Sequence, residues 1–238
     1  MLEIILLSLL TIVASGVGTL TGFGTSTIMV PVLSLFMPLP QVLLLVGIIH
    51  WCGDVWKVIL FREGVKWRLI LAFGIPGIIA SIIGASLTFN ISKPILSKTL
   101  GVFLIAYVLF LLIKSNFKIP QKISAASIGG TLSGFFAGVF GVGGAVRGMF
   151  LTAFDLPKSV YIATAGVIAF AIDSARITTY LAGGSRLETQ LALGLILFIP
   201  ASFLGAKIAK KLIDRIPQEK FRIVVLVFLS LVGLKLLF

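Results

Sequence analysis

The sequence predicts an all-α integral membrane protein built from two inverted-topology repeats. Each repeat is expected to hold a broken-helix, re-entrant-like hairpin followed by three transmembrane helices. The first observation is composition: of 238 residues, 58% are hydrophobic and only 12% are charged, and the mean hydropathy is +1.17. A soluble domain of this length needs far more charge to cover its surface, so we expect a multi-pass protein of the cytoplasmic membrane.

The apolar residues fall into segments separated by short polar breaks. The segments are 2–17, 20–37, 41–61, 69–89, 95–113, 122–139, 144–154, 158–181, 189–209 and 221–238. These runs are too long for membrane-spanning strands and do not alternate, so they are predicted to be helices.

The second observation is that the chain matches itself after a shift of 119 residues. The matches are Gly22 with Gly141, Gly24 with Gly143, Pro38 with Pro157, Gly47 with Gly166, Asp54 with Asp173, Lys57 with Arg176 and Gly64 with Gly183. We interpret this pattern as an ancient duplication. The predicted units are a first repeat over 1–114, a cytoplasmic linker over 115–121 and a second repeat over 122–238, together forming one transmembrane domain.

The third observation is the placement of the basic residues, which bears on orientation. A helix of about 16 residues covers about 24 Å, less than the ~30 Å hydrocarbon core, so each glycine turn is expected to join two short helices in a hairpin. With this hairpin, thirteen basic residues fall on one side and four on the other, against nine and eight for a broken helix that crosses once. The positive-inside rule favours the hairpin, which inverts the second repeat and places both termini outside. Two full spans would give the same topology, so the depth of the hairpin stays open.

The composition also limits the classes of partner and chemistry. A net charge of +12 would suggest nucleic acid in a soluble protein, but these charges lie mostly between apolar segments and are explained by topology. We expect a lipid bilayer as surroundings and no nucleic acid. The single cysteine, Cys52, excludes a multi-cysteine metal site, and the chain lacks a P-loop, zinc-ligand spacing and a nucleophile elbow. No cofactor, metal or enzymatic activity is expected.

Inverted repeats with interrupted helices are typical of secondary transporters. Helices that begin near Thr25 and Gly144 would place free N–H groups and positive dipole ends at the bilayer middle, where an anion is a suitable partner and glycine permits its close approach. The alternative is that these glycines only allow tight helix packing. The candidate substrate-binding residues are Gly22, Gly24, Thr25, Ser26, Thr27, Gly141, Gly143, Gly144 and Arg147.

Arg147 distinguishes the two repeats, because the matching position holds Ile28. A charge inside the membrane costs roughly 2.5–3.5 kcal/mol, so it needs a reason. The guanidinium fork suits two oxygens of a sulfonate, sulfite or carboxylate, which predicts contact with a small-molecule anion. The alternative is that the side chain extends along a groove to the lipid headgroups.

Five further residues are candidates for coupling or gating. Asp54 and Lys57, like Asp173 and Arg176, are spaced to form an ion pair on one helix face. Each pair either neutralises itself and serves structure and gating, or its carboxylate carries a proton that couples transport to a gradient. His50, the only histidine, lies about one turn before Asp54 and is either a packing residue or part of such a relay.

The duplicated turns resemble those of the TauE/SafE-like sulfite exporter family of membrane permeases. The first copy carries Gly22-Phe23-Gly24-Thr25 followed by Pro38 and Pro40; the second carries Gly141-Val142-Gly143-Gly144 followed by Leu156-Pro157; Gly-Ala pairs at 84–85 and 205–206 add to the likeness. The resemblance covers nearly the whole chain and implies a permease for sulfite, thiosulfate, sulfoacetate or other organosulfur anions. The family's usual turn is Gly-x-Gly-Gly-Gly, and the departures in both copies here concern the choice of anion.

We therefore predict a secondary permease for small anions, with sulfite and organosulfur anions favoured as substrates. An anion-selective channel and a membrane accessory protein that transports nothing are the two alternatives. The sequence leaves the direction of transport open, and also the choice between a monomer and a homodimer.

Overall fold

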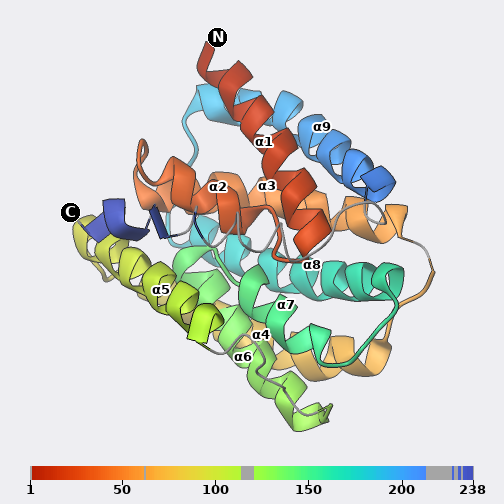
Figure 1. Ribbon diagram of the computed structural model, residues 1–238. Helices are drawn as coiled ribbons and strands as arrows, with labels where there is room; N and C mark the ends of the chain where they lie inside the picture. The colour runs from red at the N-terminus through yellow and green to blue at the C-terminus, as the bar shows by residue number, and fades with distance from the viewer. Residues whose placement is uncertain are drawn as a thin grey trace.

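The computed structural model describes residues 2–61, 63–113, 121–212, 227, 230–231 and 233–237, and within them the regular elements are all helices. In chain order these are α1 (Leu2–Thr21), α2 (Ser26–Leu33), α3 (Leu39–Leu60), α4 (Trp67–Leu87), α5 (Lys93–Ile113), α6 (Ile123–Phe140), α7 (Gly144–Thr152), α8 (Lys158–Ala182) and α9 (Thr189–Leu212) (Figure 1). Most of the predicted linker and of the last apolar segment lies outside the described residues.

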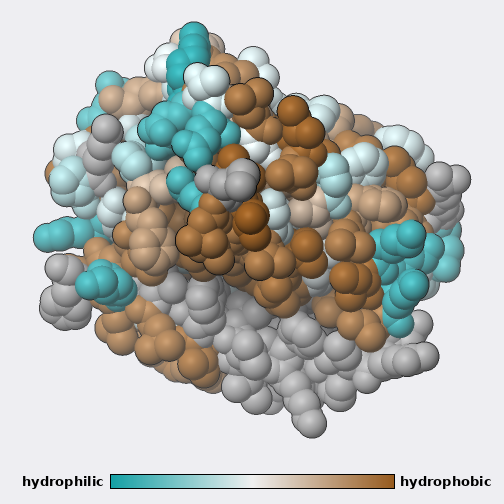
Figure 2. Space-filling view, turned by 90° about the horizontal axis from the view of Figure 1, so that it is seen from above, coloured by the Kyte–Doolittle hydropathy of each residue, from teal (hydrophilic) through white to brown (hydrophobic). Residues whose placement is uncertain are grey.

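Six of the described helices, α1, α3, α4, α6, α8 and α9, are long and apolar enough to cross a membrane. Their outer faces are apolar: Leu6, Leu9 and Val13 of α1 and Leu193 and Leu197 of α9 are exposed. Figure 2 looks onto this side and shows a broad hydrophobic face with hydrophilic residues toward its ends. Such a face is expected of a surface in contact with lipid, and the all-α membrane fold is confirmed.

The glycine turns join helices of unequal length, which corrects the predicted hairpin of two short helices. α1 and α6 have 20 and 18 residues, enough to cross or nearly cross a core of about 30 Å, whereas α2 and α7 have only 8 and 9. α2 begins only at Ser26, inside the predicted segment 20–37, because Gly22 and Gly24 adopt φ of +73° and +81°. This left-handed backbone cannot continue a right-handed helix.

The helices form layers, and their contacts occur in matched pairs. In Figure 1, α1 and α9 lie along one side, α4 and α6 along the opposite side, and α3 and α8 between them. Helices α1, α2, α3 and α4 correspond in order to α6, α7, α8 and α9. When each helix is exchanged for its counterpart, the contact of α1 with α9 becomes that of α6 with α4, and the contact of α3 with α9 becomes that of α8 with α4. The contacts of α3 with α8 and of α2 with α7 map onto themselves.

Individual side chains at the contact of α3 with α8 follow the same exchange. The rings of Trp51 and Phe170, which are 119 positions apart, stack with centroids 4.9 Å apart. A methyl group added to Gly47 would meet Arg176 of α8, and one added to Gly166 would meet Lys57 of α3. Two copies of one unit about a twofold axis would produce such contacts, although the orientation of each copy in the membrane stays a prediction.

The outer helix pairs approach closely because glycines line them. A Cβ added to Gly130, Gly134 or Gly138 of α6 would lie 2.0–2.3 Å from a backbone oxygen of α4. In the matching pair, a Cβ on Gly205 of α9 would lie 2.3 Å from the carbonyl oxygen of Ile12 in α1. Small residues allow this backbone contact, which is a main source of helix association in membranes.

Candidate functional site

The two glycine turns, which are far apart in the sequence, contact one another directly. A Cβ on Gly144, the first residue of α7, would lie 1.9 Å from the carbonyl oxygen of Phe23 in the first turn. The first turn is held by a hydrogen bond from the N–H of Gly24 to the carbonyl of Gly18, 3.1 Å long. The second begins at Gly141, which caps α6 with φ of +70°. The broken segments of both halves therefore meet at one place.

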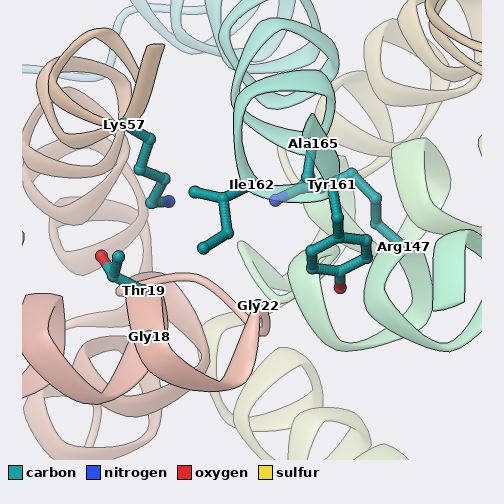
Figure 3. Close-up of a pocket in the computed structure, with 8 residues that line it drawn as sticks. All are labelled: Gly18, Thr19, Gly22, Lys57, Arg147, Tyr161, Ile162 and Ala165. Atoms are coloured by element: carbon teal, nitrogen blue, oxygen red, sulfur yellow. The ribbon is translucent and has the colours of Figure 1, made fainter. Parts of the chain in front are cut away.

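A narrow pocket with room for about one water molecule opens beside this meeting point. Its lining residues come from both halves: Gly18, Thr19, Gly22, Lys57, Arg147, Tyr161, Ile162 and Ala165. Figure 3 shows Lys57 on one side of the pocket and Arg147 and Tyr161 on the other, with Thr19 in the last turn of α1 and Gly22 just after that helix. A pocket so lined combines two cations and two hydroxyl groups with an apolar wall.

Three of the lining residues carry buried polar atoms that have no hydrogen-bond partner among the residues that the structure describes. These are Nε of Arg147, the hydroxyl of Tyr161 and Oγ1 of Thr19. Arg147 is only 3% exposed, and no salt bridge joins it to an acid in the part of the chain that the structure describes. Leaving such groups unpaired in an apolar interior is costly. The arrangement suits a bound anion, which would accept hydrogen bonds from all three donors.

The absence of a side chain at Gly22 allows Tyr161 to pack against the first turn. A Cβ at this position would lie 2.4 Å from the hydroxyl oxygen of Tyr161, and the backbone already adopts φ of +73°. Any larger residue would therefore push against Tyr161 and strain the turn.

Lys57 connects the pocket to a buried ion-pair network. Its Nζ donates to Oδ1 of Asp54 at 2.8 Å, and Nε of Arg176 donates to Oδ1 of Asp173 at 2.7 Å. Both predicted pairs therefore form, one on α3 and one on α8. His50 joins them, with Nδ1 2.6 Å from Oδ2 of Asp173 and 3.6 Å from Oδ2 of Asp54.

One nitrogen of His50, atom Nε2, is buried without a partner. Nδ1, Oδ2 of Asp54 and Oδ2 of Asp173 lie close enough for a metal ion to be considered. However, Lys57 and Arg176 already neutralise the two carboxylates, and a metal cation would be repelled by both. We interpret the cluster as a charge-balanced hydrogen-bond network between α3 and α8.

Of the sequence-predicted residues, Gly22, Lys57 and Arg147 line the pocket. Lys57 and Arg147 are buried, so neither extends to the headgroups. The other candidates lie nearby. Gly24 faces His50, while Gly141, Gly143 and Gly144 pack against Leu43, Ser133 and Phe23 respectively. The hydroxyl of Thr27 donates to the carbonyl of Phe23. The hydroxyls of Thr25 and Ser26 are buried without partners among the described residues.

The sequence prediction missed Gly18, Thr19, Tyr161, Ile162 and Ala165. Tyr161 carried a usable signal, because it is one of only three tyrosines and lies inside an apolar helix, where a hydroxyl needs a partner. Ile162 and Ala165 carried none, since apolar residues on a membrane helix are found everywhere.

The family model described as Sulfite exporter TauE/SafE matches residues 7–236. Because this match covers nearly all of the 238 residues, the chain belongs to that family, and the resemblance of the glycine turns is confirmed. Membership indicates a multi-pass membrane permease of the sulfite and organosulfur exporter class. No curated protein matches the chain at a significant level.

Proposed function

We propose that this member of the sulfite exporter TauE/SafE family carries sulfite or a small organosulfur anion across the cytoplasmic membrane, and that the anion binds in the pocket between the glycine turns. The observation that carries the proposal is the set of unpartnered donors on Arg147, Tyr161 and Thr19, placed beside the Lys57 ammonium. A sulfur oxyanion has several acceptor oxygens on one small centre, which matches this set.

The electrostatics of the pocket favour a net negative ligand. Arg147 and Lys57 both face it, and only Lys57 has an acidic partner, Asp54. α7 begins beside Arg147, so its positive dipole end adds to the charge of the guanidinium. Two positive features side by side repel each other in a low-dielectric interior, and an anion between them removes that cost.

Release and uptake require the pocket to widen, because in this conformation it has room for about one water molecule. The positive-φ glycines at 22 and 24 and the proline at 31 inside α2 are the positions where the chain can hinge. With inverted repeats and both termini outside, movement about these turns would open the pocket alternately to each side.

The proposal is tested by replacing Arg147 with Gln in the purified protein. We expect affinity for the anion to fall about 10- to 150-fold, since a hydrogen bond to a charged group contributes about 1.5–3 kcal/mol. Binding is measured as a thermal shift with sulfite, thiosulfate, sulfoacetate, taurine and simple carboxylates, because a ligand of the folded state raises its apparent stability.

Arg186→Gln is the matched control, since it removes the same charge from an exposed turn. Unchanged affinity in a folded Arg147→Gln protein would contradict the site, and so would an equal loss in the control. In proteoliposomes, flux that saturates and responds to anion on the far side would distinguish a transporter from a channel.

A further inference from the structure

We propose that His50 is a proton-binding site and that this proton couples to anion binding in the pocket. The inference rests on the proposed function for the identity of the anion, but the proton site itself can be tested without it. Histidine is the side chain that exchanges a proton with water most readily near neutral pH. His50 is the single histidine of the chain and is buried where the two halves meet.

The geometry leaves one position open for the proton. Nδ1 of His50 lies 2.6 Å from Oδ2 of Asp173, so the neutral ring carries its hydrogen there and donates to the carboxylate. Nε2 then has a free lone pair, and it is buried with no partner. A Cβ on Gly24 would lie 2.5 Å from Nε2, so this nitrogen faces the first glycine turn, two residues beyond Gly22 of the pocket wall.

The charges of the network change when Nε2 takes up a proton. Asp54 and Asp173 are balanced by Lys57 and Arg176, so the network is neutral while His50 is neutral. When a proton from water forms an N–H bond at Nε2, the ring becomes a cation held between both carboxylates, at 2.6 Å and 3.6 Å. The network then carries one positive charge that an anion can balance.

Asp54 transmits this charge to the pocket. Its Oδ1 accepts from Lys57, and its Oδ2, which has no hydrogen-bond partner, lies toward His50. A protonated His50 competes for Asp54 and leaves the Lys57 ammonium less neutralised where it lines the pocket. The proton and the anion therefore each favour binding of the other, as linkage requires.

Other ionisable groups lie on the helix of His50 and on the helices packed against it. Those on its own helix are Cys52, Asp54 and Lys57. Those on α8 are Lys158, Tyr161, Asp173, Arg176 and Tyr180. The neighbouring helices bring Glu3 of α1, Lys98 and Tyr107 of α5, and Lys207, Lys210 and Lys211 of α9. α2 carries no ionisable side chain. Within the part of the chain that the structure describes, the ring pairs with Asp173 and Asp54.

Only one of the two halves has this proton site. The position 119 residues after His50 is Ala169, so the exchange that relates Asp54 to Asp173 has no second imidazole. One proton per bound anion is the stoichiometry that follows.

The proton site is tested by NMR on protein with isotope-labelled histidine, purified with a tag that contains no histidine. The ring of His50 gives the only histidine signal, and a series of spectra from about pH 8 to about pH 5 follows its protonation. Asp54→Asn should shift that titration. A ring that stays in one protonation state over the whole range would overturn the proposal, whether or not an anion binds.

The coupling is tested with thiosulfate and methanesulfonate, which keep their charge over the same pH range. Affinity should rise on the order of tenfold as the pH falls through the titration of His50, with uptake of about one proton per anion measured by calorimetry in two buffers. His50→Gln keeps a donor for Asp173 and should bind the anion with an affinity that no longer depends on pH.

The two proposals fail in different ways. A wild-type protein that binds these anions equally at every pH, or a His50→Gln protein that keeps the pH dependence, overturns the coupling and leaves the anion site intact. If Arg147→Gln leaves anion affinity unchanged, the anion site is wrong, whatever His50 does.

Discussion

The pocket beside the first glycine turn and the region beside the second occupy positions related by the shift of 119 residues, yet different side chains line them. Subtracting 119 from Arg147 and Tyr161 gives Ile28 and Val42, two apolar residues. Beside the second turn, a Cβ on Gly141 would lie 2.9 Å from Leu43 and 3.0 Å from Val30. These two apolar side chains, together with Nη1 of Arg176 at 3.6 Å from the same Cβ, occupy the space that stays open beside the first turn.

The comparison shows that the two regions share backbone features but differ in the side chains available to bind a ligand. Both frames keep the positive-φ glycine and the cation, Lys57 in one and Arg176 in the other. In the first frame the cation faces the pocket. In the second frame the cation, Arg176, is paired with Asp173. Tyr180 donates its hydroxyl hydrogen to the carbonyl of Gly138. The first frame thus has an open pocket beside its unpartnered donors, whereas the two unpartnered Nη atoms of Arg176 in the second frame lie among packed side chains.

The ion pairs provide the largest expected contrast. Asp173→Asn leaves the fully buried Arg176 without an anionic partner, and we expect a loss of about 3–5 kcal/mol in the free energy of unfolding. Asp54→Asn should cost less, because Lys57 faces the pocket, where water or an anion can solvate it. Unfolding of the purified variants in detergent measures both, and equal losses would contradict the comparison.

The first residues after the two turns give a second contrast. Gly144 corresponds to Thr25, and a Cβ on Gly144 would lie 1.9 Å from the carbonyl oxygen of Phe23. Gly144→Thr should therefore force the turns apart, lower stability by about 1–3 kcal/mol and abolish transport. Thr25→Gly removes a hydroxyl that has no partner and should change stability by less than about 1 kcal/mol. If both variants behave alike in thermal unfolding and flux assays, the contact between the turns is unimportant.

Two tyrosines give the smallest and most specific contrast. Tyr161→Phe removes an unpartnered hydroxyl from the pocket, so we expect anion affinity to fall about 3- to 10-fold while stability is unchanged, as for a neutral hydrogen bond of about 1 kcal/mol. Tyr180→Phe removes a hydroxyl that is bonded to the backbone, so stability should fall and affinity should not. The reverse outcome would place the anion beside the second turn.

Much of the fold could be predicted from local sequence. The long helices other than α1 begin and end within three residues of the predicted segments, because apolar runs between polar breaks define them. The short helix α7 begins at Gly144 as expected, and α2 begins at Ser26. The arms of the first hairpin were wrong: α1 runs to Thr21 through Gly16 and Gly18, since glycine in an apolar helix is tolerated when neighbours pack against it.

The site was only partly predictable. Ion pairs within one helix follow from a spacing of three residues, so both were found. The contact of His50 with Asp173 spans 123 residues, and the approach of Tyr161 to Gly22 depends on how α8 packs on the first turn. Such contacts arise from tertiary packing, and no local pattern in the chain encodes them.

The pairing of the outer helices has a consequence for how the protein is made. α1 packs along α9, the last long helix that the structure describes, and α4 packs along α6, so each outer helix of the first half lies against a helix of the second. During translation, α1 is synthesised long before α9. Until synthesis passes Gly205, the surface of α1 around Ile12 and Gly16 must face lipid or an insertion chaperone. The contact of α1 with the second half therefore forms only after α9 has been synthesised and inserted.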